Sequence, residues 1–86
     1  MRALNFAILK YFTSHDEADA KIVMEELKPE YGRFRAFKEP AVVESLMSAK
    51  ENGLLDESRY TVEGDGLRVF YQANEYGRKM IDGFIK

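Results

Sequence analysis

The chain has 86 residues, 45% hydrophobic and 33% charged, with no cysteine and a net charge of −2. This length suits one small domain, residues 1–86, which has neither disulfides nor thiolate metal ligands to stabilise it. The charge excludes a global attraction to nucleic acid or anionic lipid, so such binding requires a local patch. No apolar run approaches the roughly 20 residues of a membrane span and no signal-peptide core follows Arg2, so we expect a cytoplasmic protein without a membrane partner.

The N-terminal segment, MRALNFAILKYF at residues 1–12, has the pattern of a buried helix. Apolar residues recur at intervals of four and would lie on one stripe. The stripe predicts a first helix whose core residues are Leu4, Ile8 and Phe12.

A second helix is predicted to begin near His15. Ser14 and Glu17 have the spacing of a capping box, which satisfies free backbone N–H groups at a helix start. Lys28 precedes Pro29, and a residue before proline is disfavoured in helical geometry, so we expect the helix to stop there. The apolar positions in between have helical spacing and are Ala20, Val23, Met24 and Leu27.

Residues 29–38, PEYGRFRAFK, mix aromatic and basic residues without a regular period and are interpreted as a connector. Its ten residues exceed the roughly 3 to 4 of an ordinary helix-turn-helix turn. Pro40 fits the first position of a third helix over residues 40–52, and Gly53 fits a left-handed residue at its end. The face of this helix that we expect in the core carries Val43, Leu46, Met47 and Lys50.

Two alternating segments flank Gly64, Asp65 and Gly66, a pattern that predicts a β-hairpin. Phe70 on the second segment either packs against a neighbouring loop such as 31–37, which we favour, or forms a platform for a partner. The expected core face of the hairpin carries Tyr60, Val62, Leu67, Val69 and Tyr71, and the opposite face carries Arg59, Arg68 and Phe70.

Asn74 fits the cap of a fourth helix with a broad apolar face. That face has two interpretations, a homodimer contact or part of the core of its own chain. Its residues are Tyr76, Met80, Ile81, Phe84 and Ile85.

Three helices, a two-stranded hairpin wing and a C-terminal helix give the order of the winged helix-turn-helix fold, an α+β class. VVESLMSAKENGLLDES resembles the end of a recognition helix and the start of a wing, and LRVFYQANEYGRKMID is similar to the second wing strand and last helix of PadR-like and MarR-like regulators. Asn74, Glu75 and Gly77 stand where those families usually have Thr, an acidic residue and Gly. The start AILKYF resembles small phage-associated winged-helix proteins of the YjcQ type.

The resemblance implies a DNA-binding transcriptional regulator of bacterial or phage origin, with duplex DNA as partner and the last helix as a dimer contact. Basic residues before the third helix and on the hairpin would hold phosphates, and serines on the helix would face the bases. Each basic residue can equally be an ordinary solvated charge. The expected DNA-binding residues are Arg33, Arg35, Lys38, Ser45, Ser48, Arg59 and Arg68.

Acidic residues on the same elements support an alternative, a winged helix that binds a protein and no DNA. They are Glu39, Glu44 and Glu51 beside the third helix and Glu63 and Asp65 at the hairpin tip.

The sequence gives no sign of an enzyme, a metal site or a cofactor. His15 is the only histidine and is interpreted as a solvated loop residue. The acidic residues around it lack the spacing of a calcium loop, and the Gly64 to Gly66 turn lacks a phosphate-binding fingerprint.

Overall fold

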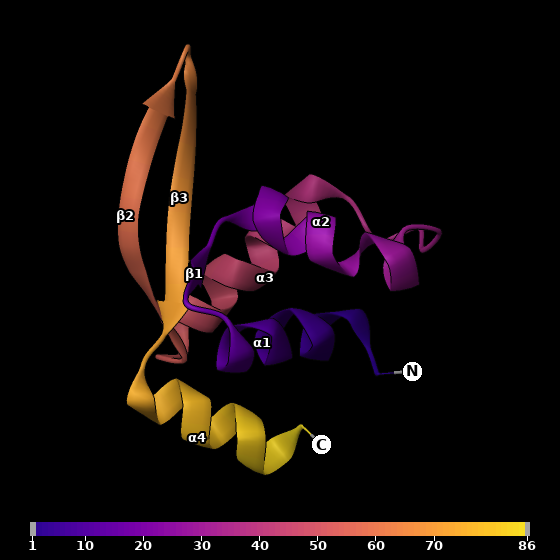
Figure 1. The fold of residues 1–86 in the computed structure, drawn as a ribbon, viewed down its shortest axis with the longest axis vertical. Coiled ribbons are helices and arrows are strands. Elements are labelled where there is room, and N and C mark those ends of the chain that lie inside the picture. The colour runs from indigo at the N-terminus through magenta and orange to yellow at the C-terminus, as the bar shows by residue number, and fades with distance from the viewer. Residues whose placement is uncertain (1, 86) are drawn as a thin grey trace.

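The computed structural model describes residues 2–85, in which four helices surround one end of a three-stranded antiparallel sheet (Figure 1). The order of elements confirms the predicted α+β architecture, and a short first strand is added to it. The helices are α1 (Leu4–Ser14), α2 (Ala20–Tyr31), α3 (Glu39–Glu51) and α4 (Glu75–Phe84). The strands are β1 (Glu17–Ala18), β2 (Leu55–Glu63) and β3 (Gly66–Ala73), in the sheet order β1-β3-β2.

The core lies where α1, α2 and α3 meet the base of the sheet. The predicted stripe of α1 is present, because Ile8 and Phe12 are fully buried and Leu4 packs against the cluster while half-buried. Side chains from each neighbouring element complete this core, among them Val23, Val42, Leu46, Leu55 and Tyr71.

The predicted start of the second helix was wrong. α1 continues to Ser14, whose hydroxyl donates to the Tyr11 carbonyl instead of capping a new helix. The chain then pairs with β3 as the strand β1, and α2 begins at Ala20. Asp19 is its N-cap, because the carboxylate accepts from the Ile22 N–H at 2.9 Å. Pairing with a distant strand therefore displaced the local capping box.

The predicted stop before Pro29 was also wrong. α2 runs on to Tyr31 with Pro29 inside its last turn. A proline there leaves one carbonyl, that of Glu25, without its helical donor, and α2 ends only two residues later. The connector is accordingly residues 32–38, shorter than the ten residues expected.

The buried face of α3 is rotated from the predicted one. Val42, Leu46 and Ala49 enter the core, whereas Val43 and Met47 are exposed. Apolar residues at 42, 43, 46 and 47 allow two neighbouring stripes, and the small Ala49 fits the core better than Lys50. The helix begins at Glu39, one residue before the expected start, and Gly53 has the expected left-handed conformation with φ of 80°.

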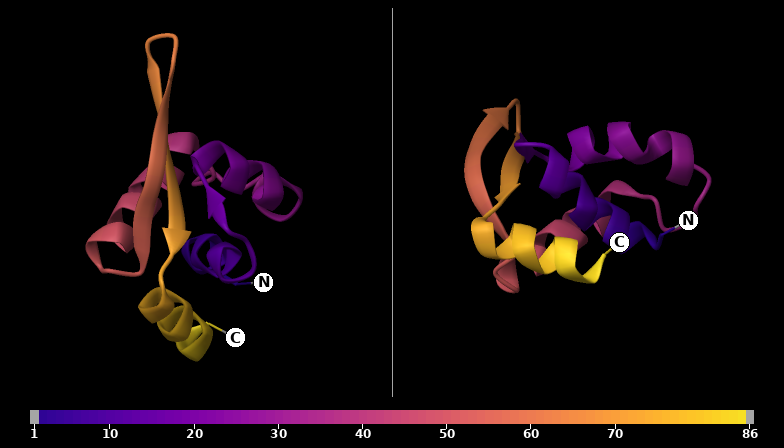
Figure 2. Two further views of the ribbon diagram at one scale, coloured as in Figure 1. Left: turned by 60° about the vertical axis from the view of Figure 1, so that its left-hand side comes forward. Right: turned by 60° about the horizontal axis from the view of Figure 1, so that its bottom comes forward.

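The hairpin of β2 and β3 projects from the helical body (Figures 1 and 2). Its two-residue turn has Gly64 at a φ of 61° followed by Asp65, as a type II′ turn requires. The outer half has no helix beneath it, so Tyr60, Val62 and Leu67 are exposed, and their expected place in the core was wrong. Ser58 is an extra residue, a bulge, between the pairs Glu57–Tyr71 and Arg59–Phe70.

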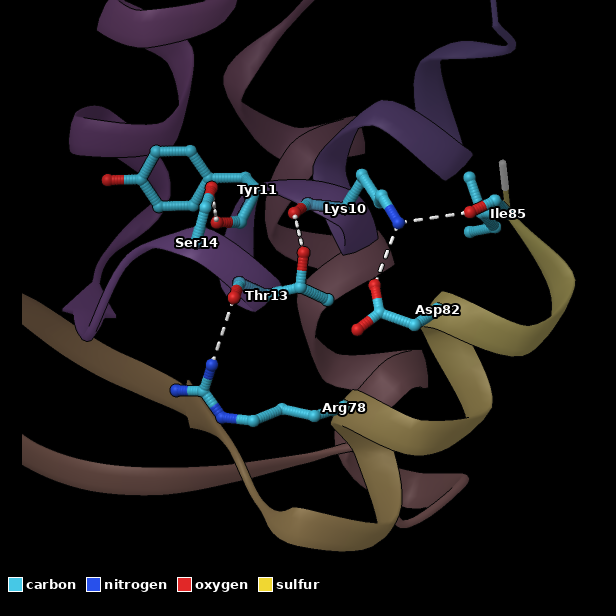
Figure 3. Close-up of polar contacts among 7 residues, drawn as sticks. All are labelled: Lys10, Tyr11, Thr13, Ser14, Arg78, Asp82 and Ile85. Atoms are coloured by element: carbon cyan, nitrogen blue, oxygen red, sulfur yellow. Dashed lines mark hydrogen bonds and ion pairs between the residues drawn. The ribbon is translucent and has the colours of Figure 1, made fainter.

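Helix α4 packs on α1 at the end of the molecule away from the hairpin tip (Figure 1). Lys10 on α1 pairs with Asp82 at 2.7 Å and donates to the Ile85 carbonyl at 3.0 Å, while Arg78 donates to the Thr13 carbonyl at 3.1 Å (Figure 3). Ile81 and Ile85 are buried, so part of the apolar face belongs to the chain's own fold.

The start of α4 is joined to the end of α3 through one cap. Asn74 accepts from the Gly77 N–H at 2.7 Å, which confirms the predicted cap, and its amide donates to the Gly53 carbonyl at 2.9 Å. Gly77 lies directly against the backbone of Leu54, and a Cβ at this position would collide with the Leu54 carbonyl. Any other residue at position 77 would therefore push α4 away from the turn after α3.

We expect Leu46→Ala to lower the free energy of unfolding by about 2–5 kcal/mol, because it leaves a cavity in the core. Leu46 is 1% exposed. The measurement is denaturant unfolding, with Met47→Ala on the same helix as the matched control. Met47 is 51% exposed, so its truncation should change stability by no more than about 1 kcal/mol. Equal effects of the two substitutions would contradict the observed rotation of α3.

Candidate nucleic-acid interface

The loop before α3, residues 32–38, presents three exposed basic side chains on an anchored backbone. Tyr31 and Phe37 are buried with Ala7 in a small second cluster, and turn hydrogen bonds from Phe34 and Phe37 hold the backbone between them. The exposed side chains are Arg33, Arg35 and Lys38. Within residues 2–85 no ion pair involves any of these three, so their charges face solvent in full.

Two further arginines, on the hairpin, occupy a very different environment. Arg59 and Arg68 lie over the ring of Phe70, with guanidinium carbons 3.9 and 5.2 Å from its centroid. Phe70 is buried, so the expectation that it packs is confirmed, but the expected neighbour was wrong: these two arginines cover the ring, and Tyr31 and Phe37 of the loop 31–37 belong to a separate cluster. We call Arg59, Arg68, Phe70, Glu17 and Asp19 the Phe70 cluster.

Acidic residues neutralise both arginines. Arg59 Nε lies 2.6 Å from Glu17, which also accepts from Ser58, the bulge residue. Arg68 Nε lies 2.5 Å from Asp19 and its Nη1 lies 3.3 Å from Glu63. With Glu63 included, three carboxylates face the two guanidinium groups, so the Phe70 cluster has no net positive charge to offer a phosphate.

The carboxylate of Asp19 is the most buried charged group of this cluster. Burial alone would raise the pKa of Asp19, but hydrogen bonds from Arg68 and from the Ile22 N–H outweigh it and hold the pKa below its ordinary value of 3.8. The hydrogen bond from Ser58, followed by that from Arg59, lowers the pKa of Glu17 in the same way. Both carboxylates are therefore ionised at neutral pH and hold their arginines in place.

The structure does not bring the expected basic residues together into one patch. Asp19, which pairs with Arg68, caps the N-terminus of α2, whereas the loop 32–38 follows its C-terminus. Twelve helical residues separate these points, about 18 Å at 1.5 Å per residue. The loop accordingly lies at the end of the helical body away from the hairpin (Figure 1).

The two serines expected to face DNA lie on one flank of α3. Ser48 is exposed, and Ser45 is half-buried beside the core stripe. At about 100° per residue, both lie on the flank away from Val43. The opposite flank, which carries Val43 and Met47, borders a groove between α3 and the hairpin with a volume of about 500 Å³.

His15 is exposed in the bend after α1, with its ring stacked on that of Tyr11 at 4.0 Å and its Nδ1 2.9 Å from the Tyr11 carbonyl. Among residues 2–85 no group of three or more histidine or acidic side chains could hold a metal ion. Within the same residues, no helix has the length and apolar character needed to cross a bilayer.

No family model and no curated protein matches this chain. Solved structures do match. Bacillus subtilis PadR in complex with operator DNA superimposes with a TM-score of 0.73 at 24% identity over 100% of this chain, and a PadR-like transcription factor from Bacteroides fragilis with a TM-score of 0.66 at 19% identity over 93%. This chain has the winged-helix fold of PadR-like transcription factors. It spans 49% of the PadR chain and 74% of the second protein.

In this fold α3 is the third helix and the β2–β3 hairpin is the wing. Glu17 and Asp19 are the partners of the hairpin arginines that sequence reasoning missed, because both were assigned to a helix. The available signal was the i, i+2 spacing of Glu17 and Asp19, which an extended strand would place on one face.

Asp19→Asn should destabilise the protein at neutral pH, by about 1–3 kcal/mol, since Asn can still cap α2 but removes the charge that faces Arg68. Because folding lowers the pKa of Asp19, its contribution is complete above pH 3.8 and is lost as the pH falls further. Denaturant unfolding at several pH values should therefore show the wild type and the variant converging in acid. A difference that stays constant from pH 7 to about 2 would contradict the ion pair.

Proposed function

We propose that this protein is a DNA-binding transcriptional regulator that holds duplex DNA through the loop 32–38 and α3. The observation that carries the proposal is the set of three exposed basic side chains in the loop before α3, none of which forms an ion pair within residues 2–85. The PadR structure in complex with operator DNA, which shares this fold, supports it. We take the activity to be binding, without catalysis.

In this proposal Arg33, Arg35 and Lys38 contact phosphates, and these contacts set position and affinity. Ser45 and Ser48, on one flank of α3, would read base edges. Arg59 and Arg68 reach DNA only if phosphates replace the carboxylates of Glu17 and Asp19, so we assign them a secondary role at the wing.

We further propose that two copies associate through α4. Tyr76, Met80 and Phe84 follow one another at intervals of four and form a stripe on α4 beside the buried Ile81. Tyr76 is 55% and Phe84 78% exposed, values that leave much apolar surface in water.

One observation favours the second candidate function, a winged helix that binds protein instead of DNA. The exposed side of α3 carries Glu39, Glu44 and Glu51, and all three side chains lie in solvent. A helix with this charge repels the phosphate backbone, so DNA binding rests on the loop alone.

Changing Arg33, Arg35 and Lys38 together to Ala should weaken binding to all duplex sequences. Each lost phosphate contact lowers the slope of log affinity against log salt by about 1, so the triple variant should lose up to about 3. Ser45→Ala should instead change the preference among sequences at a nearly constant salt slope. The measurement is fluorescence anisotropy with mixed duplexes at several salt concentrations.

The matched control is Lys79→Ala, an exposed basic residue on α4 that lies outside the proposed surface. Its salt slope should equal that of the wild type. Absence of wild-type binding at about 50 mM salt, where non-specific affinity is high, would refute the DNA proposal and leave protein binding as the function.

Phe84→Glu should give a folded monomer at concentrations where the wild type sediments as a dimer, because it places a charge in the α4 stripe. Circular dichroism checks the fold, and Tyr60→Glu, on the exposed hairpin, is the matched control that should leave the dimer intact. A wild-type chain that remains monomeric at high micromolar concentration would exclude the α4 dimer.

A further inference from the structure

The groove between α3 and the wing has one wall with a regular chemical pattern. Glu39, Val43, Met47 and Glu51 all line it and follow one another at intervals of four, so they form one stripe along α3. The two apolar side chains lie in the middle and the two carboxylates at the ends. From the first to the last residue the stripe rises about 18 Å.

The wing supplies the opposite wall. Leu67 and Val69 on β3 face the groove, and the buried Leu46 and Tyr71 lie at its floor. Leu67 is 62% exposed although it is part of a sheet. Exposed apolar residues therefore face one another from both walls, which is the arrangement of a surface that a partner covers.

The rim of the groove is acidic after its internal ion pairs are taken into account. Lys50 pairs with Glu57 at 2.7 Å, and Arg68 pairs with Asp19 and Glu63. Among the described lining residues this leaves Glu39 and Glu51 unpaired, against the single unpaired cation Lys21. The remaining groups thus favour a positively charged occupant.

We propose that this groove binds a basic amphipathic helix of a protein partner. An apolar stripe on the bound helix would lie against Val43, Met47 and Leu67, and Lys or Arg residues about 18 Å apart would pair with Glu39 and Glu51. A nucleic acid does not fit this surface, because its phosphates would meet the same two carboxylates and its backbone would gain nothing from the apolar walls.

This inference goes beyond DNA binding and does not depend on it. A helix in the groove would occupy the wing-facing side of α3. The loop 32–38 lies next to the Glu39 end of the stripe. The serine flank proposed for DNA lies on the opposite side of α3, so bound protein and bound DNA would occupy different sides of this helix. A partner with a basic helix would therefore bind in the groove whether or not the chain also holds DNA.

The test uses a fluorescein-labelled peptide of about 17 residues made of Leu, Ala and Lys, with Leu on one helical stripe and Lys on its flanks. A second peptide has the same Leu stripe with Glu in place of Lys. Anisotropy titrations of the full chain, without DNA, should show saturable binding of the Lys peptide and at least roughly tenfold weaker binding of the Glu peptide.

Variants of the chain then locate the site. The double change Glu39→Lys and Glu51→Lys should weaken the Lys peptide by roughly tenfold or more. The control with the same change in net charge, Glu25→Lys and Glu44→Lys, alters exposed residues outside the groove and should have a much smaller effect. Met47→Asp should weaken binding of both peptides, and circular dichroism confirms that each variant is folded.

Equal losses in the two double variants would overturn the proposal, since they would show a general charge effect. Equal affinity for the Lys and Glu peptides would overturn the basic character of the partner. A wild-type dimer that Met47→Asp or the Lys peptide dissociates would assign the groove to a second copy of this chain. Failure of the DNA proposal would give a different result: the wild-type chain would bind no duplex DNA but would still bind the Lys peptide.

Discussion

One buried carboxylate, that of Asp19, joins the helical body to the wing. It is 4% exposed, so its charge requires partners, and it has them on both sides: the Ile22 N–H at the start of α2 and the guanidinium of Arg68 on β3. The carboxylate thus caps the start of α2 and ties Arg68, in the outer half of the hairpin, to the helical body. Together with the Lys50–Glu57 ion pair between α3 and β2, this contact holds the second wall of the groove beside the helical body.

Sequence reasoning succeeded where a signal is satisfied within a few residues. Asn74 caps α4, Gly53 ends α3 and Gly64 forms the turn, because each needs only its immediate neighbours. It failed where a distant partner decides. β1 has two residues and no periodicity of its own, and it forms because β3 offers free backbone groups to Glu17 and Ala18. On α3 two adjacent apolar stripes were equally good locally, and only the shape of the core selects the one that contains Val42.

Only some features of the candidate site could be predicted from the sequence. That Arg33, Arg35 and Lys38 lie in a loop follows from their irregular surroundings, so their exposure could be anticipated. The neutralisation of Arg59 by Glu17 could not, since 42 positions separate them and the contact depends on both the bulge at Ser58 and the strand β1. A count of basic residues along the sequence therefore overstated the positive charge of the wing. Helix α3 lies between a positively charged loop at its N-terminus and an apolar groove with an acidic rim.

The fit of Gly77 against Leu54 joins α4 closely to the end of α3. A change in the angle between these two helices would break both this contact and the hydrogen bond from Asn74 to the Gly53 carbonyl. If chains pair through α4, the separation of their two α3 helices is then set by rigid geometry. If the chain also binds duplex DNA as we propose, such a pair would contact half-sites at one spacing along the duplex, and a single inserted base pair, which shifts one half-site by about 3.4 Å and rotates it about the axis, would leave it out of register.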